Sequence, residues 1–314
     1  CVITNGVNNK VITSLGGFVG NGIDCSLNNS NYSFIGNGNT NIIKGVSDRS
    51  CIVNGYINDI IGSLGGFIGN GIDCSLNNSN YSFIGNGHTN TIEGVSDRSC
   101  IVNGNINDIS GSLGSFIGCG GQNTITSSNN AFLGGGNNNT INNTSDRSII
   151  IGGNINDISG SFYGFIGNGT DCSLNNSNYS LIGNGNTNGM IDSSHCVITN
   201  GVNNKVITSL GGFVGNGINC SLNNSNYSVI IDGSANGILD SSNCIITNGV
   251  NNNIITSLGG FIGNGIDCSL NNSDYSFIGN GNTNTIEGES VRSCIVNGNI
   301  NDISGSSSSF IGCG

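Results

Sequence analysis

The sequence is poor in the residues that build helices. It contains no proline, no tryptophan and one methionine, and only 8% of its residues are charged. Alanine, glutamate, lysine and arginine, which are common in helices, are all scarce. This shortage argues against a helical protein or an ordinary α/β enzyme.

Further absences narrow the classes of function. Seven basic residues stand against 18 acidic ones, so no basic stripe is available for nucleic acid. No apolar run reaches about 18 residues, so we expect no insertion into a membrane. The sequence lacks a signal peptide and an initiator methionine, and it begins and ends inside a repeat. We therefore expect it to be a segment of a longer chain.

The chain also lacks the spacings of a metal or catalytic site. Its 13 cysteines form no C-x-x-C motif, and neither His88 nor His195 stands at a metal-ligand spacing. No Ser-His-Asp arrangement and no local acidic cluster is recognisable. We expect no cofactor, no metal and no enzymatic activity, and we expect both histidines at surface turns.

The cysteines leave several interpretations open. The favoured one treats them as small buried apolar residues that are copied along with their repeat. The pairs Cys1/Cys25, Cys196/Cys220 and Cys244/Cys268, each 24 residues apart, would also allow a disulfide across the core. A third interpretation places cysteines in contacts between chains; it concerns Cys51, Cys100 and Cys294.

What the chain has in abundance is a fixed period. The glycine that ends each "NG" or equivalent, here called the repeat glycine, recurs 20 times from Gly6 to Gly314, every 16 residues or, in four places, every 17. Sixteen residues fit one coil of two short strands and two turns. We predict an all-β parallel β-solenoid of about 20 coils of 16–17 residues, continuous as one repeat domain over residues 1–314.

Several columns of the repeat point to the interior. The residue three before the repeat glycine and the residue five after it are always apolar, as in Ile35 and Met190. Eight or nine after it there is always serine, as in Ser30 and Ser47, and the one-residue insertions stand just before it. Three after it stands a structural column of asparagine or cysteine that we expect to bond to turn backbone. This Asn/Cys column includes Asn9, Cys25, Asn41, Asn58, Cys74, Asn90, Cys172, Cys220 and Cys268.

A second apolar column stands four residues before the repeat glycine. Where it holds phenylalanine, glycine follows two residues later, and where it holds cysteine, valine follows. Such volume compensation is typical of a close-packed space, so we predict that this Phe column is an interface between copies of the chain. The alternative is one wide monomeric core containing both apolar columns. The predicted interface residues are Phe18, Phe34, Phe67, Phe83, Phe116, Phe132, Phe165, Phe213, Phe261, Phe277 and Phe310.

These repeats resemble two groups of fibrous proteins. "SFIGNG" (Ser33–Gly38), "SLIGNG" (Ser180–Gly185) and "SCIVNG" (Ser99–Gly104) resemble repeats in the heads of YadA-like trimeric autotransporter adhesins. "AFLGGGNNNTI" (Ala131–Ile141) and "SIIIGGNINDI" (Ser148–Ile158) are similar to repeats of giant-virus and phage fibre proteins. The resemblance implies a parallel β-roll that forms a homotrimer along one apolar face. The Asn columns, the 13 cysteines and the scarcity of alanine favour the viral fibres over the adhesins.

We therefore expect a structural fibre protein on a virion surface or in another extracellular place, giving rigid reach and attachment. The expected partner is the chain itself, with a host surface glycan as a second partner. An adhesin or glycan-binding solenoid is the alternative, and an ice-binding solenoid ranks below it because threonine is scattered. The arginines of the repeated "SDRS", Arg49, Arg98 and Arg147, either bind a sulfated or sialylated glycan or pair with the adjacent aspartates or another chain.

Overall fold

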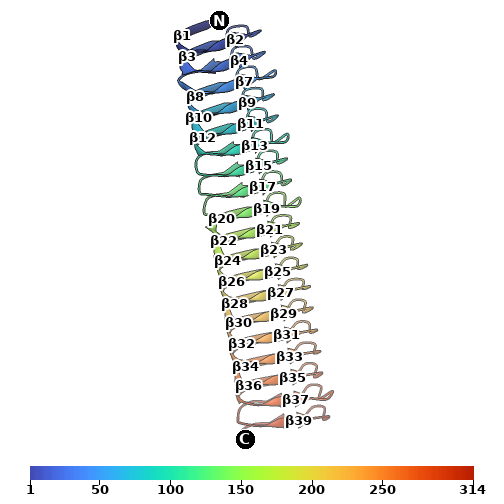
Figure 1. Cartoon of the computed structure of the whole chain (residues 1–314). Helices are drawn as coiled ribbons and strands as arrows, with labels where there is room; N and C mark the ends of the chain where they lie inside the picture. The colour runs from blue at the N-terminus through green and yellow to red at the C-terminus, as the bar shows by residue number, and fades with distance from the viewer. The chain divides into compact units, whose positions relative to one another are not determined.

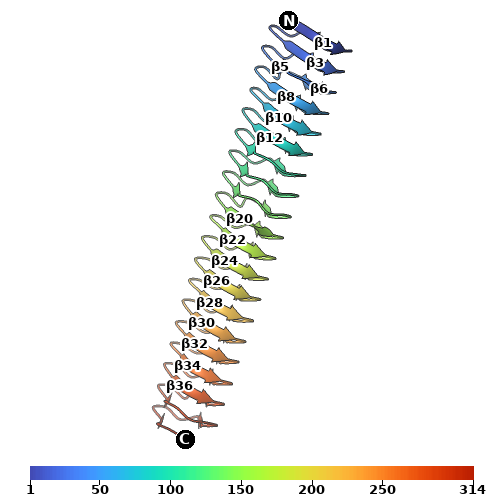
Figure 2. The same ribbon diagram turned by 90° about the vertical axis from the view of Figure 1, so that its left-hand side faces the viewer.

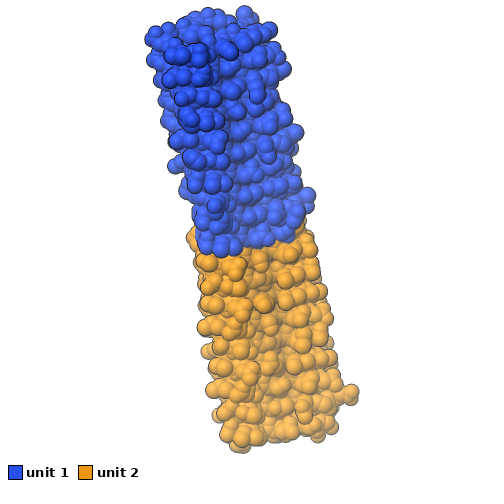
Figure 3. Space-filling view, viewed as in Figure 1, with its two compact units in different colours: residues 1–159 blue, residues 160–314 orange.

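The computed structural model of the chain describes all 314 residues. It consists of strands and turns without helices, arranged as a parallel β-solenoid of about 19 turns. This confirms the predicted all-β parallel solenoid. The chain divides into two compact units, unit 1 (residues 1–159) and unit 2 (residues 160–314), which are coloured separately in Figure 3. No helix is long and apolar enough to cross a bilayer.

Each complete coil contains a first strand of up to six residues and a second strand of three. The first strands of unit 1 are β1 (Val2–Val7), β3 (Phe18–Ile23), β5 (Phe34–Ile35) with β6 (Gly38–Asn39), β8 (Cys51–Tyr56), β10 (Phe67–Ile72), β12 (Phe83–His88), β14 (Cys100–Ile101), β16 (Phe116–Ile117), β18 (Phe132–Leu133) and β20 (Ile149–Asn154). Its second strands are β2 (Lys10–Ile12), β4 (Ser26–Asn28), β7 (Ile42–Lys44), β9 (Asp59–Ile61), β11 (Ser75–Asn77), β13 (Thr91–Glu93), β15 (Asp108–Ser110), β17 (Thr124–Thr126), β19 (Thr140–Asn142) and β21 (Asp157–Ser159).

Unit 2 repeats this plan. Its first strands are β22 (Phe165–Thr170), β24 (Leu181–Asn186), β26 (Val197–Val202), β28 (Phe213–Ile218), β30 (Val229–Ser234), β32 (Ile245–Val250), β34 (Phe261–Ile266), β36 (Phe277–Asn282), β38 (Cys294–Ile295) and β40 (Phe310–Ile311). Its second strands are β23 (Ser173–Asn175), β25 (Gly189–Ile191), β27 (Lys205–Ile207), β29 (Ser221–Asn223), β31 (Gly237–Leu239), β33 (Asn253–Ile255), β35 (Ser269–Asn271), β37 (Thr285–Glu287) and β39 (Asp302–Ser304). Since no second strand follows β40, the twentieth repeat glycine belongs to an incomplete coil.

Within each unit the strands pair in parallel and in register with the repeat. Phe67 pairs with Phe83 in the first-strand sheet, and Leu76 pairs with Ile92 in the second-strand sheet. Figure 1 shows the second strands lying one above the next, and Figure 2 shows the first strands doing the same. Equivalent residues of successive coils therefore stack into columns, and neighbouring residues within one column are about 4.8 Å apart.

The core lies between the two sheets and is narrow. Each coil contributes one large apolar side chain from each strand, such as Ile68 and Leu76, and both are fully buried. The remaining inward positions hold serine, asparagine, cysteine, glycine or, once, alanine. The inserted Val46 and Val95 are exposed at turns, so the 17-residue coils keep the same core.

The prediction of two turns per coil was one too few. Left-handed backbone recurs at three corners, shown in one coil by Asp73 (φ 57°), Asn78 (φ 52°) and Tyr81 (φ 55°). The third corner is needed because Ser79 and Ser82 are both buried while the two residues between them face outward.

Candidate functional surfaces

The Asn/Cys column lies inside the coil, where its side chains join neighbouring coils. The amide oxygen of Asn58 accepts a hydrogen bond from the backbone N–H of Cys74, at 3.0 Å. Its amide nitrogen donates to the carbonyl oxygen of Gly71, at 2.8 Å, and its backbone N–H donates to the side-chain oxygen of Asn41, at 3.0 Å. Each asparagine thus satisfies buried backbone groups of adjacent coils, which is a structural role.

Cysteine occupies the same column with weaker bonds. The thiol of Cys74 lies 3.7 Å from the carbonyl oxygen of Gly87 and 3.6 Å from that of Ile72. Burial raises the pKa of the Cys74 thiol, so it stays protonated and poorly reactive at neutral pH. All 13 cysteines are free, and none of the three pairs 24 residues apart forms a disulfide.

Serine forms two further internal ladders. The hydroxyl of Ser63 accepts the backbone N–H of Ser79 at 3.0 Å and donates to the carbonyl oxygen of Ile61 at 3.1 Å. The hydroxyl of Ser50 accepts from the N–H of Gly66 and donates to the carbonyl of Ser63. The invariant serine of the repeat is therefore a coil-to-coil connector, a role that its fixed spacing alone did not reveal.

The Phe column lies on the outer face of the first-strand sheet. Phe34, Phe83 and Phe277 are each 38% exposed, and most of the others are half-buried. Rings of consecutive coils stack, with centroids 5.0 Å apart between Phe67 and Phe83. The column is therefore outside the coil, and the alternative of one wide core containing both apolar columns is wrong.

The glycine that follows each phenylalanine has a cause within the chain. A Cβ atom at Gly36 would collide with the carbonyl oxygen of Val53 in the next coil and lie 3.1 Å from Cε1 of Phe34. Gly85 is placed in the same way beneath Phe83. The rings of Phe34 and Phe83 fold back over the glycine of their own strand, so volume compensation in this column does not by itself require a second chain.

The third corner carries an exposed aromatic and basic ridge that the sequence analysis missed. Six of the seven tyrosines occupy this position, together with all four arginines and His195; we call it the corner ridge. Its tyrosines are 40–62% exposed. Its members are Gly16, Tyr32, Arg49, Gly65, Tyr81, Arg98, Gly114, Asn130, Arg147, Tyr163, Tyr179, His195, Gly211, Tyr227, Asn243, Gly259, Tyr275, Arg292 and Ser308. The sequence does contain a signal for this ridge. Gly16, Tyr32 and Arg49, from three successive coils, recur 49 residues later as Gly65, Tyr81 and Arg98.

The aspartates beside these arginines are engaged elsewhere. The carboxylate of Asp97 accepts the backbone N–H of Asn80 at 2.6 Å, and Asp48 accepts that of Asn31 at the same distance. No ion pair joins Asp97 to Arg98. The predicted pairing of these arginines with their adjacent aspartates is therefore wrong for Asp97 and Arg98.

The outer face of the second-strand sheet carries scattered carboxylates. Burial, with a smaller contribution from Glu93, raises the pKa of Asp108 from 3.8 to about 6. Burial also raises the pKa of Asp59, and Lys44 opposes that shift. One carboxylate oxygen of Asp59 is buried without a hydrogen-bond partner. These aspartates occupy the same slot of different coils.

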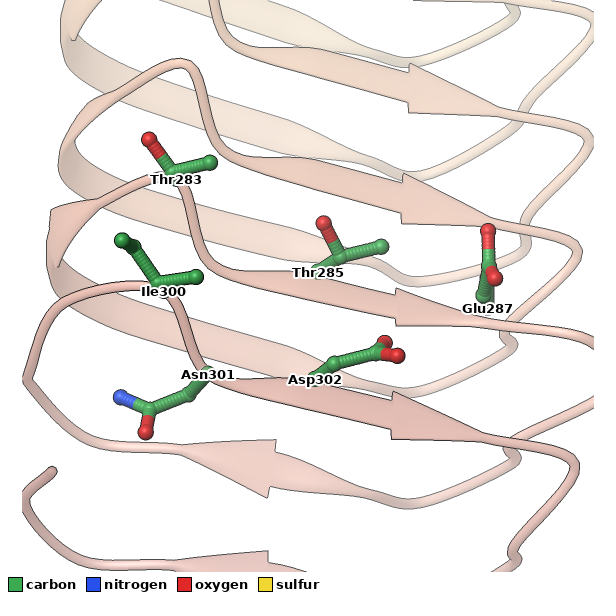
Figure 4. A pocket seen from close by; sticks show the side chains of 6 residues that line it. All are labelled: Thr283, Thr285, Glu287, Ile300, Asn301 and Asp302. Atoms are coloured by element: carbon green, nitrogen blue, oxygen red, sulfur yellow. The ribbon is translucent and has the colours of Figure 1, made fainter.

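The same face contains a shallow hollow of about 320 Å³ (Figure 4). Its lining comes from two successive coils, and the carboxylates of Glu287 and Asp302 lie at its edge. No group of three or more His, Cys, Asp or Glu side chains gathers there or elsewhere in the structure. His88 closes β12 rather than lying in a turn as predicted, and the ring of His195 stacks on Tyr179 with centroids 5.1 Å apart.

Comparison with known proteins adds little to this description. No family model matches the chain, and no curated protein matches it. Among solved structures, a chain described as "putative acetyltransferase from Desulfovibrio desulfuricans G20" is 8% identical, with a TM-score of 0.14; the match covers 66% of this chain and 63% of that one. A likeness this low carries no argument about fold or activity. The resemblance to adhesin heads and viral fibres stays a prediction.

Proposed function

We propose that the chain is a structural segment of a surface fibre, on a virion or in another extracellular place, in which three copies pack through the Phe column. The observation that supports it best is the position of that column. Large apolar rings lie half-exposed along the outer face of the first-strand sheet in both units. A long apolar stripe of this kind is typical of an interaction surface.

The internal ladders support a structural role. The bonds of Asn58 and Ser63 reach only adjacent coils, so each added coil repeats the same contacts. Stability then grows by nearest-neighbour stacking, and length grows by duplication. Cys1–Gly22 and Cys196–Gly217 are identical in sequence, as duplication would produce. The proposal assigns the chain no catalytic step.

The order of large and small side chains along the Phe column supports a defined register between copies. Two stacked rings, such as Phe18 and Phe34, are followed by a coil with Cys51 in their column and Val53 in the glycine column. This combination occurs three times, ending at Cys51, Cys100 and Cys294, and the first two are three coils apart, about 14 Å at about 4.8 Å per coil. Rings of one copy would fit beside the smaller cysteine coils of another.

The Phe column offers a modest area per neighbour. Ten coils at about 4.8 Å, with a stripe about 10 Å wide, give about 500 Å² per unit. The two units together offer about 1,000 Å² per chain, which a trimer divides between two neighbours at about 500 Å² each, compared with about 800 Å² per partner in a standard interface.

The test is the molar mass of variants in solution. Replacing Phe67 and Phe83 by aspartate places charges in the stripe and should convert the assembly to single chains. Asn28→Asp, on the outer face of the second-strand sheet, is the matched control and should leave the mass unchanged. Retention of the assembly by the double Phe→Asp variant would remove the Phe column as the interface.

A further inference from the structure

The corner ridge holds bulky side chains on a backbone that favours glycine. Tyr32, Tyr81 and Tyr275 all have φ of 55°, in the left-handed region. Glycine fills the same position in other coils, as at Gly65 and Gly114, without this strain. Strained exposed positions that keep large side chains are typical of functional surfaces.

The tyrosine rings are held in place and leave their polar ends free. A Cβ atom at Gly65 would lie 3.0 Å from Cδ1 of Tyr81, and one at Gly259 would lie 2.9 Å from Cδ1 of Tyr275. Each of these rings therefore rests against the glycine of the preceding coil. The hydroxyls of Tyr81 and Tyr275 make no hydrogen bond, and both residues are more than half exposed.

Tyr32 and Tyr81 of unit 1 are followed by the same series of residues in the next two coils. The coil after Tyr81 presents Asp97 and Arg98, and the next presents Leu113 and Gly114. Where Asn130 replaces the expected tyrosine, a hollow of about 290 Å³ opens, lined by Asp97, Arg98, Leu113, Gly114 and Asn130. An aromatic face, an arginine fork, a carboxylate and a small hollow thus lie along one corner within four coils.

We infer that the corner ridge binds a neutral linear polysaccharide lying along the stack. The apolar C–H face of a pyranose ring packs on tyrosine, which supplies a rigid apolar surface with a polar tip. The guanidinium fork of arginine donates to neighbouring hydroxyls, and the aspartate accepts from them. In unit 1, Tyr32 and Tyr81 lie three coils apart, about 14 Å, so an extended glycan would contact one tyrosine ring in every three coils.

Charge selects a neutral ligand over a sulfated one. Arg49, Arg98 and Arg147 each follow an aspartate, so these steps of the ridge carry no net charge. The whole chain carries a formal charge of −11, which repels polyanions. Neutral hydroxyls need no net charge for hydrogen bonding.

The experiment measures binding of three neutral hexasaccharides, with β-1,4-linked glucose, β-1,4-linked N-acetylglucosamine and β-1,4-linked mannose, and of heparin as the sulfated probe. The test variant replaces Tyr32, Tyr81, Tyr227 and Tyr275 by asparagine, which the ridge already holds at Asn130 and Asn243. Asparagine tolerates left-handed backbone, so the fold should be retained. Tyr56→Asn is the control, because Tyr56 is 48% exposed in a different column.

The expected result is that the unchanged chain binds at least one neutral hexasaccharide more tightly than heparin. The fourfold variant should lose at least tenfold in affinity, and Tyr56→Asn should lose none. Absence of neutral binding, tighter binding of heparin, or full binding by the fourfold variant would overturn the inference. If the unchanged chain binds no sugar and the fourfold variant changes the molar mass, the ridge is an interface instead. The fibre proposal is judged separately, by the Phe67 and Phe83 variant.

Discussion

The two units have equivalent interior columns and differ at their outer corner. Ile84 in unit 1 and Ile182 in unit 2 occupy the same fully buried column. In unit 1 the corner ridge repeats a series of three coils: glycine, then tyrosine or asparagine, then arginine. In unit 2 it begins with three aromatic side chains in successive coils. Tyr163 and Tyr179 stack at 5.2 Å, and His195 follows at 5.1 Å. Interior columns are constrained by every neighbouring coil, while the corner is constrained by its backbone angle and by contacts along the ridge, such as that of Tyr81 with Gly65, and it varies more.

One buried slot holds serine in some coils and cysteine in others, in both units. Ser50 of unit 1 donates to the carbonyl of Ser63 at 2.7 Å and accepts the N–H of Gly66 at 3.0 Å. Cys196 of unit 2 makes the equivalent contacts at 3.2 Å with Ser209 and Gly212. The ladder therefore tolerates a longer, weaker partner provided that the geometry is kept.

The largest expected effect is in the shared interior. Ile84→Ala and Ile182→Ala each remove buried methyl groups and leave a cavity, so each should destabilise its unit by about 2–5 kcal/mol. Ile72→Ala, at a 47% exposed position, should cost much less. Urea unfolding with hydrogen exchange in the neighbouring coils measures both. A cost in one unit only would show that the interiors are not equivalent.

The Asn/Cys column should give the next largest effect. Asn58→Ala leaves the N–H of Cys74 and the carbonyl of Gly71 without their partner, which should cost about 1–3 kcal/mol for each buried group. Asn58→Cys should cost less, because its thiol can still reach backbone carbonyls as Cys74 does. Thermal unfolding compares the two variants. Equal losses would show that a thiol does not replace the amide, and no loss in Asn58→Ala would contradict the connecting role of the amide.

Exchanging serine and cysteine tests this slot directly. Cys196→Ser should shorten two hydrogen bonds and stabilise unit 2, while Ser50→Cys should destabilise unit 1, each by about 1 kcal/mol or less. Thermal scans of both variants under reducing conditions provide the measurement. Shifts of the same sign in both would refute the proposed equivalence of the slots.

A further effect depends on pH. Because the folded pKa of Asp108 is raised to about 6 from 3.8, the folded state binds more protons between these values, and stability falls as pH rises from about 4 to about 6. Asp108→Asn should therefore stabilise unit 1 at pH 7 and change little at pH 3. Asp59→Asn should gain less at pH 7, since it also loses the attraction of Lys44. Melting temperatures at pH 3 and pH 7 decide this, and an Asp108→Asn gain confined to pH 3 would contradict it.

Much of the fold was predictable because each coil repeats the same constraint. The fixed spacing of Ile35 and Ile43 predicted the interior, and the register follows from the period. The third corner was missed because left-handed residues there include Tyr81 and Arg98, types that do not signal a turn. The cause of the glycine beside Phe34 was also missed, since the folding of a ring over its own strand depends on three-dimensional backbone contacts. The corner ridge became clear only when the third corner placed six tyrosines together.

The most direct test of the central claim is the molar mass of the unchanged chain in solution across a range of concentrations. The account predicts a trimer, three times the 31.9 kDa of one chain. A mass of 31.9 kDa that does not change with concentration would contradict it, and the Phe column would then be explained entirely by ring packing within one chain.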